Sequence, residues 1–245
     1  MALPNDATTA DTVFEPWWRI GRRFMAPHMH SYKSAVARVL VDQFEPGWSV
    51  LDVGCDDGSL ATLIQREQPT VEFQGVDIQS LRPCKIPRAI YDGRTLPFAD
   101  NSFDAVMAVD MLHHTKHIDV LVSEMARVAR HCVIVKDHLT SGWFSWLLVA
   151  FGDAMTNIPY GIPCAYNFPS LPDWLRIFER SDLHLASFND QLQLNGCCIA
   201  KYNPLFRLLK ASSRQEWNAG AGNLSSTPLQ VVGGSVSSDL ATVRT

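Results

Sequence analysis

The segment from Val50 to Leu60, which reads VLDVGCDDGSL, restricts the possible folds of this chain more than any other. A short apolar stretch enters a loop that carries Gly54 and Gly58, and a helical pattern follows. Glycine allows a positive φ and a close approach of the backbone to a ligand. The helix that follows offers free backbone N–H groups to a carboxylate or phosphate. The segment therefore predicts a strand, loop and helix that bind a ligand at the carboxyl end of a buried strand.

Short apolar runs alternate with helical patterns along most of the chain, which predicts βαβ units. We expect the first helix to run from His30 to Phe44. The predicted strands are Ser49–Val53, Phe73–Ile78, Ala89–Tyr91, Phe103–Val109, Cys132–Val135, Leu183–Phe188 and Cys197–Tyr202. The prediction is a single α/β domain with a doubly wound, mostly parallel, seven-stranded sheet of the Rossmann-like kind.

Composition divides the chain into three parts. Residues 1–29 are expected to form an N-terminal arm, residues 30–210 the domain, and residues 211–245 a flexible tail rich in Ser, Gly, Ala and Thr. Within the domain, residues 138–168 have the composition of an apolar insertion.

An acid ends the second predicted strand. Asp77 lies 19 residues after Gly58, where a carboxylate can accept hydrogen bonds from both hydroxyls of a ribose. A nicotinamide dinucleotide is the alternative in this architecture, but the loop reads GCDDGS rather than GxGxxG. Asp56 and Asp57 would then face a pyrophosphate of the same charge. A cationic sulfonium ligand with an amino acid end fits these acids better.

These motifs together resemble those of the class I S-adenosylmethionine-dependent methyltransferases that act on small molecules. The resemblance covers roughly Val36 to Asp137. It rests on VLDVGCDDG, on GVDIQ around Asp77, on YDGRTLPFADNSFDAV from Tyr91, and on MLHHT from Met111. It implies S-adenosyl-L-methionine as the cofactor.

The resemblance also implies the cofactor-binding residues. Asp77 would bind the ribose, Ile78 would pack on the adenine, and Asp92 would accept a hydrogen bond from the adenine amino group. Asp52 would orient the loop and interact with the methionine amino group. The full expected set is Asp52, Gly54, Cys55, Asp56, Gly58, Asp77, Ile78, Asp92, Gly93, Asp110 and Met111.

Asp56 stands where the family usually has the middle glycine of the loop. Its side chain would weaken cofactor binding, turn outward, or hold the amino group of the cofactor, and the sequence does not choose among these. The departure keeps open a second hypothesis, a non-catalytic methyltransferase-like binding or scaffold protein. A nicotinamide-dependent oxidoreductase is a third.

An oxygen acceptor would need a base to remove its proton, and His114 and His138 are the candidates. For His113 we favour a packing role or one in shaping the cofactor site. No metal site is expected, because no clustered histidine and carboxylate ligands appear near the cofactor motifs and no cysteine pair has CxxC spacing.

The segment from Leu139 to Phe168 contains one acid, Asp153, and no Lys or Arg. Asp153 and Asn157 are four residues apart, so they share a helix face and need partners in apolar surroundings. The segment is either an extra core helix or a lid or wall for the acceptor, and docking of its tryptophans on a membrane surface is a third interpretation.

Charge and segment lengths exclude some partners. The formal net charge of −4 argues against a dedicated nucleic-acid binder. The longest apolar run, Trp143 to Phe151, has 9 residues with Ser145 inside it, whereas a membrane span needs about 20, and no signal peptide is visible. We predict a cytoplasmic enzyme that transfers a methyl group to a small lipophilic or aromatic acceptor.

Overall fold

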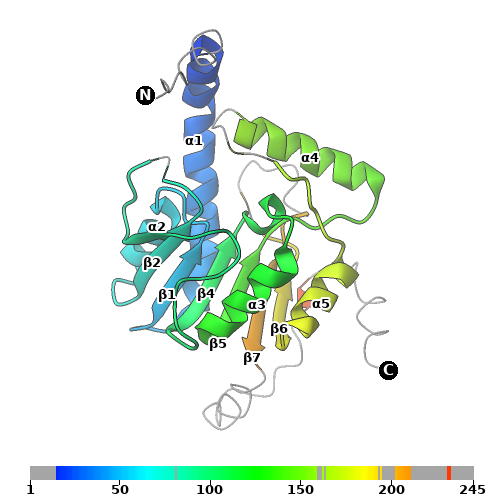
Figure 1. The fold of residues 1–245 in the computed structure, drawn as a ribbon. Coiled ribbons are helices and arrows are strands. Elements are labelled where there is room, and N and C mark those ends of the chain that lie inside the picture. The colour runs from blue at the N-terminus through cyan, green and yellow to red at the C-terminus, as the bar shows by residue number, and fades with distance from the viewer. Residues whose placement is uncertain are drawn as a thin grey trace, which may run out of the picture.

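The computed structural model describes residues 15–80, 82–158, 162, 164–192, 194, 202–210 and 231–232. Its strands form one sheet in the order β3-β2-β1-β4-β5-β7-β6-β8 (Figure 1). Their bounds are β1 Ser49–Val53, β2 Glu72–Asp77, β3 Arg88–Ile90, β4 Phe103–Val109, β5 Ala129–Lys136, β6 Leu183–Asn189, β7 Leu205–Lys210 and β8 Val231–Val232.

Strands β1 to β5 pair in parallel, and β7 is antiparallel to both β5 and β6. The strand order reverses between β1 and β4, the point at which ligands bind in open α/β sheets. The predicted doubly wound sheet is confirmed. The two residues of β8 add to the edge of its seven main strands, pairing with β6.

The helices are α1 Glu15–Leu40, α2 Ser59–Glu67, α3 Ile118–Val128, α4 Trp143–Asn157 and α5 Leu171–Arg180. Helix α1 begins well before the predicted start at His30 and continues through Pro27. The predicted arm, residues 1–29, therefore includes the first half of a helix, while residues 1–14 lie outside the described part. Most of the predicted tail also lies outside it, and within the tail β8 is described.

The last predicted strand, Cys197–Tyr202, has only Tyr202 within the described residues, and the antiparallel partner of β5 is β7, which the apolar runs did not predict. Residues 195–201 lie outside the described residues. In β7 the side chains of Phe206 and Leu208 are fully buried, and Phe206 packs on Phe178 of α5 with ring centroids 5.1 Å apart.

Hydrophobic cores lie on both faces of the sheet. Strand β4 contributes Val106 and Ala108 to the core under α3 and α5, and Ala105 and Met107 to the core under α1 and α2. All four side chains are 0% exposed, which explains why β4 is apolar without alternation from Ala105 to Val109.

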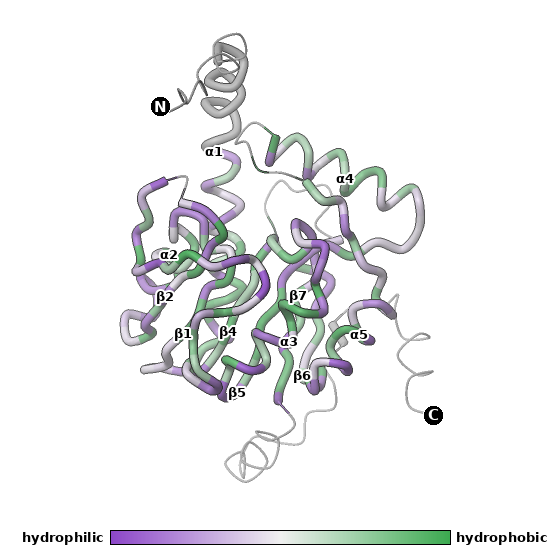
Figure 2. The backbone as a smooth tube through the Cα atoms, in the orientation of Figure 1, coloured by the Kyte–Doolittle hydropathy of each residue, from purple (hydrophilic) through white to green (hydrophobic). Residues whose placement is uncertain are grey.

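Helix α4 lies apart from these layers, across the end of the molecule (Figure 1). Much of its length is hydrophobic (Figure 2), yet large apolar side chains face solvent, with Trp143 79% and Phe151 67% exposed. Its buried residues include Ser145 and Asp153. Helix α4 is thus not an ordinary core helix. Among the described residues, no helix is long and apolar enough to cross a membrane.

Candidate functional site

A cleft of about 790 Å³ opens at the carboxyl ends of β1, β2 and β4, and residues of α1 and α4 also line it. It brings together both predicted base candidates, His114 and His138. Ten of the eleven predicted cofactor-binding residues line it as well, namely Asp52, Gly54, Cys55, Asp56, Asp77, Ile78, Asp92, Gly93, Asp110 and Met111. Gly58 does not line the cleft.

The loop after β1 has the conformation that its glycines predict. Gly54 has a φ of +76°, and a Cβ atom there would lie 2.9 Å from the side chain of Met111. Its N–H donates to the carbonyl of Val76 at 2.8 Å, which ties the loop to the end of β2. Gly58 has a φ of +68° and begins α2, so it shapes the loop from outside the cleft.

Asp56 adopts a φ of +49° in this loop, a conformation that favours glycine. Its carboxylate lies 3.5 Å from the Lys33 ammonium and 3.6 Å from the Arg82 guanidinium, and the side chain is 37% exposed. Its backbone N–H donates to Asp77 Oδ2 at 3.0 Å. The backbone N–H of Asp56 thus holds the loop against Asp77, while the Asp56 side chain pairs with two cations.

The carboxylates of Asp77 and Asp92 both accept hydrogen bonds from neighbouring backbone N–H groups. Asp77 Oδ1 accepts a hydrogen bond from the N–H of Gln79 at 3.4 Å. Asp92 Oδ1 accepts from the N–H groups of Arg94 and Thr95, which hold the pKa of Asp92 below its usual range. Because both carboxylates line the same cleft, they can hold two parts of one ligand.

An apolar surface lies between these two acids. Ile78 is 53% exposed, and a Cβ atom on Gly93 would lie 3.3 Å from its side chain. The side chain of Ile78 and the backbone of Gly93 thus lie next to each other, as a planar ring bound between them would require.

Asp52 is only 3% exposed, and its surroundings disfavour a charge. Burial raises the pKa of Asp52 to about 7, against the opposing effect of Lys33, and the carboxylate of Asp77 adds to the increase. The group therefore gains or loses a proton near neutral pH, and a cation placed beside it would favour the ionised form.

Asp110, predicted only as a cofactor residue, also anchors α1. Its φ is +51°, and its carboxylate accepts from the hydroxyl of Tyr32 at 2.8 Å and pairs with Lys136. Lys136, 1% exposed, also donates to Asn203 Oδ1 at 2.9 Å. Sequence reasoning missed this cluster. A lone lysine ending an apolar strand was the available signal.

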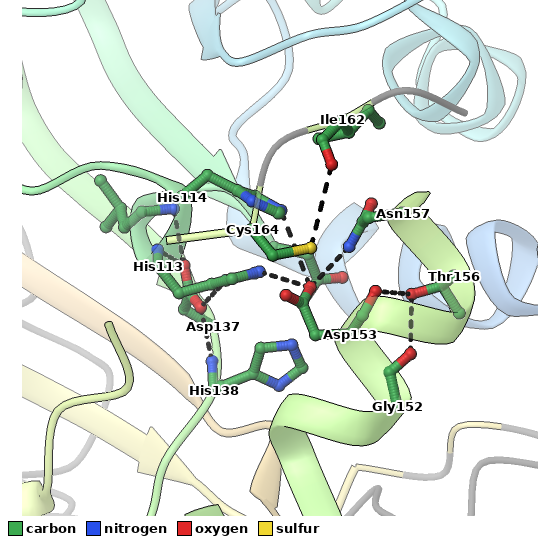
Figure 3. Close-up of polar contacts among 12 residues, drawn as sticks. His113, His114, Asp137, His138, Gly152, Asp153, Thr156, Asn157, Ile162 and Cys164 are labelled. Carbon is green, nitrogen blue, oxygen red and sulfur yellow. Dashed lines mark hydrogen bonds and ion pairs between the residues drawn. The ribbon is translucent and has the colours of Figure 1, made fainter. Parts of the chain in front are cut away.

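A chain of ionisable side chains fills the side of the cleft nearest α4 (Figure 3). His113 is 1% exposed, with Nδ1 2.6 Å from Asp137 Oδ1 and Nε2 3.0 Å from Asp153 Oδ1. Burial alone would lower the pKa of His113, but the two carboxylates outweigh it and raise the pKa to about 10. Asp137 also accepts from the N–H groups of Leu112 at 2.8 Å and His138 at 2.6 Å.

The two base candidates lie on either side of His113. Burial and the charge on His113 lower the pKa of His138 to about 4, so this imidazole is neutral at pH 7. Its Nδ1 has no hydrogen-bond partner among the described residues. His114 Nε2 lies 3.8 Å from Asp153 Oδ1, and its side chain is 18% exposed.

Asp153 and Asn157 confirm the predicted shared helix face, since Asn157 Nδ2 donates to Asp153 Oδ1 at 2.5 Å. Asp153 Oδ2 is buried without a partner among the described residues. The premise that no histidine and carboxylate ligands cluster near the cofactor motifs is wrong. Ligand atoms of His113, His138 and Asp153 lie within 4.8 Å of one another, because folding joins three segments that are separate in sequence.

Asp137 is the main residue that sequence reasoning missed. The signal was an acid directly after an apolar strand, in the pattern that also holds for Asp77 after β2 and Asp110 after β4. Carboxyl ends of neighbouring parallel strands meet at one edge of the sheet, so these acids had to converge.

Comparison with known proteins places the site in context. Residues 51–132 match the sequence profile of a family described as "Methyltransferase domain". A fatty-acid O-methyltransferase of Mycolicibacterium smegmatis is 33% identical over 108 residues, 40% of this chain and 38% of that protein. The ubiquinone/menaquinone biosynthesis C-methyltransferase UbiE of Brucella canis is 24% identical over 197 residues, 68% of this chain and 73% of that protein.

The fold also occurs in solved structures. A SAM-dependent methyltransferase from Aquifex aeolicus superposes with a TM-score of 0.53 at 14% identity, covering 78% of this chain and 97% of that one. This likeness concerns the fold. The chain spans about two fifths of the length of the fatty-acid enzyme.

Proposed function

Since this chain belongs to the class I S-adenosylmethionine-dependent methyltransferases, we propose that it transfers a methyl group to a small lipophilic or aromatic acceptor. One observation carries the proposal: a single cleft joins the cofactor motifs of the sheet to the buried histidines and to α4. Fold alone would not suffice, because one fold serves many activities.

The residues present fit S-adenosylmethionine. Asp77 would accept hydrogen bonds from the ribose, and Ile78 and Gly93 would border the adenine, with Asp92 at its amino group. Asp52 is buried in the lining of the same cleft, where the charge of the cofactor's amino group would replace the missing solvation. Asp56 stays outside this set, because its carboxylate pairs with Lys33 and Arg82.

Bound in this way, the cofactor supplies a methyl group activated by its sulfonium centre. The chain's own residues position the acceptor and exclude water, which accounts for much of the acceleration expected in such a displacement. We assign the base role to His114 and, as a second candidate, to His138. Asp153 would orient His114, whose Nε2 lies 3.8 Å away.

The acceptor class follows from the relatives and from α4. The relatives are named for a fatty acid and for quinone biosynthesis, both lipophilic. Helix α4 lines the cleft and turns Trp143, Phe144 and Phe151 outward, so we propose that it guides such an acceptor and docks on lipid surfaces.

Two measurements test the proposal. S-adenosylhomocysteine at a hundredfold excess over Kd should stabilise the protein by about 2.7 kcal/mol and raise its melting temperature. Transfer of radiolabelled methyl groups is then assayed on fatty acids, phenols and quinols. A protein that binds the cofactor product but methylates none of these would contradict the acceptor class. One that does not bind it at millimolar concentration would be the non-catalytic scaffold, and NAD is titrated as the comparison.

A further inference from the structure

From the side chains that meet beside α4, we infer that His113, His138 and Asp153 bind a divalent first-row transition-metal ion. The three residues come from the turn after β4, the end of β5 and the middle of α4, and Figure 3 places them around one point. His113 belongs to the MLHHT segment, and all three residues line the same cleft as the other cofactor motifs.

The distances suit an ion. Two ligand atoms about 2.1 Å from one metal lie about 3.0–3.4 Å apart, depending on the angle between the bonds. His113 Nε2 and Asp153 Oδ1 are 3.0 Å apart, and His113, His138 and Asp153 each offer one ligand atom within 4.8 Å of the other two. Small side-chain movements would therefore complete the coordination.

Two buried atoms of this cluster lack a hydrogen-bond partner among the described residues, namely His138 Nδ1 and Asp153 Oδ2. His138 is 8% exposed and Asp153 is 2% exposed. Buried polar atoms are almost always paired, and each exception needs an explanation. A metal ion between the two side chains would supply the missing partner.

Asp137 occupies the place of an orienting group behind a metal-bound histidine. Its Oδ1 lies 2.6 Å from His113 Nδ1, so it can accept the proton there and leave Nε2 to a metal. The metal would displace the Nε2 proton of His113, and the site would then hold two neutral imidazoles and one ligating carboxylate. A divalent charge would balance the buried carboxylates of Asp137 and Asp153. Mixed nitrogen and oxygen ligands of this kind suit zinc, iron or cobalt.

With the ion bound, His138 and His114 would have different roles. His138 would hold the metal, and the base role in the proposed methyl transfer would fall to His114. Zinc affinity is measured without any methyl acceptor, so failure of the metal site would leave the proposed function standing.

The experiment uses the full chain, stripped of metal with a chelator and titrated with zinc in competition with a chromophoric chelator. We expect one zinc per chain with a Kd of about 1 µM or tighter. Asp153→Asn and His138→Gln should each weaken zinc binding at least about 100-fold. His184→Gln, at an exposed histidine of β6, is the matched control and should bind like the parent.

Equal zinc affinity in the parent and in both ligand variants would overturn the inference, and so would a parental Kd for zinc far above about 1 µM. Cobalt gives a second readout, because a thiolate-to-cobalt charge-transfer band would place the ion on Cys164 instead. Circular dichroism and melting temperature check the folding of each variant. His138→Gln still decides if Asp153→Asn fails to fold, since the His138 side chain holds no partner at Nδ1.

Discussion

Replacing Asp77 by alanine should weaken cofactor binding while leaving the fold intact. Asp77 ends β2 and lines the cleft, and its Oδ2 accepts the backbone N–H of Asp56 at 3.0 Å. The carboxylate fixes the loop after β1, and in the proposed complex it would also accept hydrogen bonds from the ribose. A truncation removes both.

The magnitude follows from the bonds lost. A hydrogen bond to a charged group contributes about 1.5–3 kcal/mol, and the ribose offers two hydroxyls. Because both bonds share one acid and water replaces part of the interaction, we expect a loss of about 2–4 kcal/mol. That corresponds to roughly a thirtyfold to a thousandfold increase in Kd. Asp77→Asn should lose less, since its amide oxygen can still accept the N–H of Asp56.

Isothermal titration with S-adenosylhomocysteine measures these differences. Asp100→Ala is the control, because Asp100 is an exposed acid that pairs with Arg127 away from the cleft. It should bind like the parent. If Asp77→Ala binds within about threefold of the parent, the ribose assignment is wrong, and the alignment of the cofactor motifs fails with it.

Three further predictions concern the same cleft and α4. Asp56→Gly should leave the Kd for S-adenosylhomocysteine unchanged or tighter, since φ is +49° there and the carboxylate faces Lys33; much weaker binding would make Asp56 a cofactor ligand. The Kd should fall by up to about tenfold per pH unit as pH rises toward 7, because burial raises the pKa of Asp52 to about 7 and the cofactor's ammonium group favours its ionised form. If the Kd of Asp52→Asn for S-adenosylhomocysteine changes with pH as steeply as that of the parent, Asp52 is not the group responsible. In vesicle sedimentation, Trp143→Ser combined with Phe151→Ser should reduce lipid binding with little change in melting temperature, as both side chains are exposed; equal sedimentation of parent and variant would exclude docking through α4.

The strands were predictable where burial on both faces of the sheet leaves a continuous apolar run in the sequence. Strands β1 and β4 have the bounds that their apolar runs predict. The start of α1 was not predictable in this way, because Gly21 and Pro27 interrupt the helical pattern and the helix continues through both. Strand β7 was not predicted from the apolar runs, and its Phe206 packs on Phe178, a contact between distant segments.

The site residues also divide into those that a local sequence pattern predicted and those that it did not. Residues expected to bind the cofactor lie in or directly after strands, so each motif is local in sequence, and all but Gly58 reach the cleft. The buried network is different, because His113 is 24 residues from Asp137 and 40 from Asp153. No periodicity connects three such positions. Only the recurrence of an acid at strand ends gave a partial signal.

Helix α4 explains why local pattern misleads at this site. Hydrophobic periodicity would turn its aromatic side chains inward and its one acid toward solvent. In the structure Asp153 is 2% exposed and lies on the buried face with Val149 and Ala150, while Trp143 is 79% exposed. Turning the helix over to bury Trp143 would remove Asp153 from His113 and leave a buried cationic imidazole with one carboxylate fewer. The burial of Asp153 and the exposure of Trp143 are therefore best explained by what Asp153 binds. Sequences depart from the packing rules mainly at functional positions.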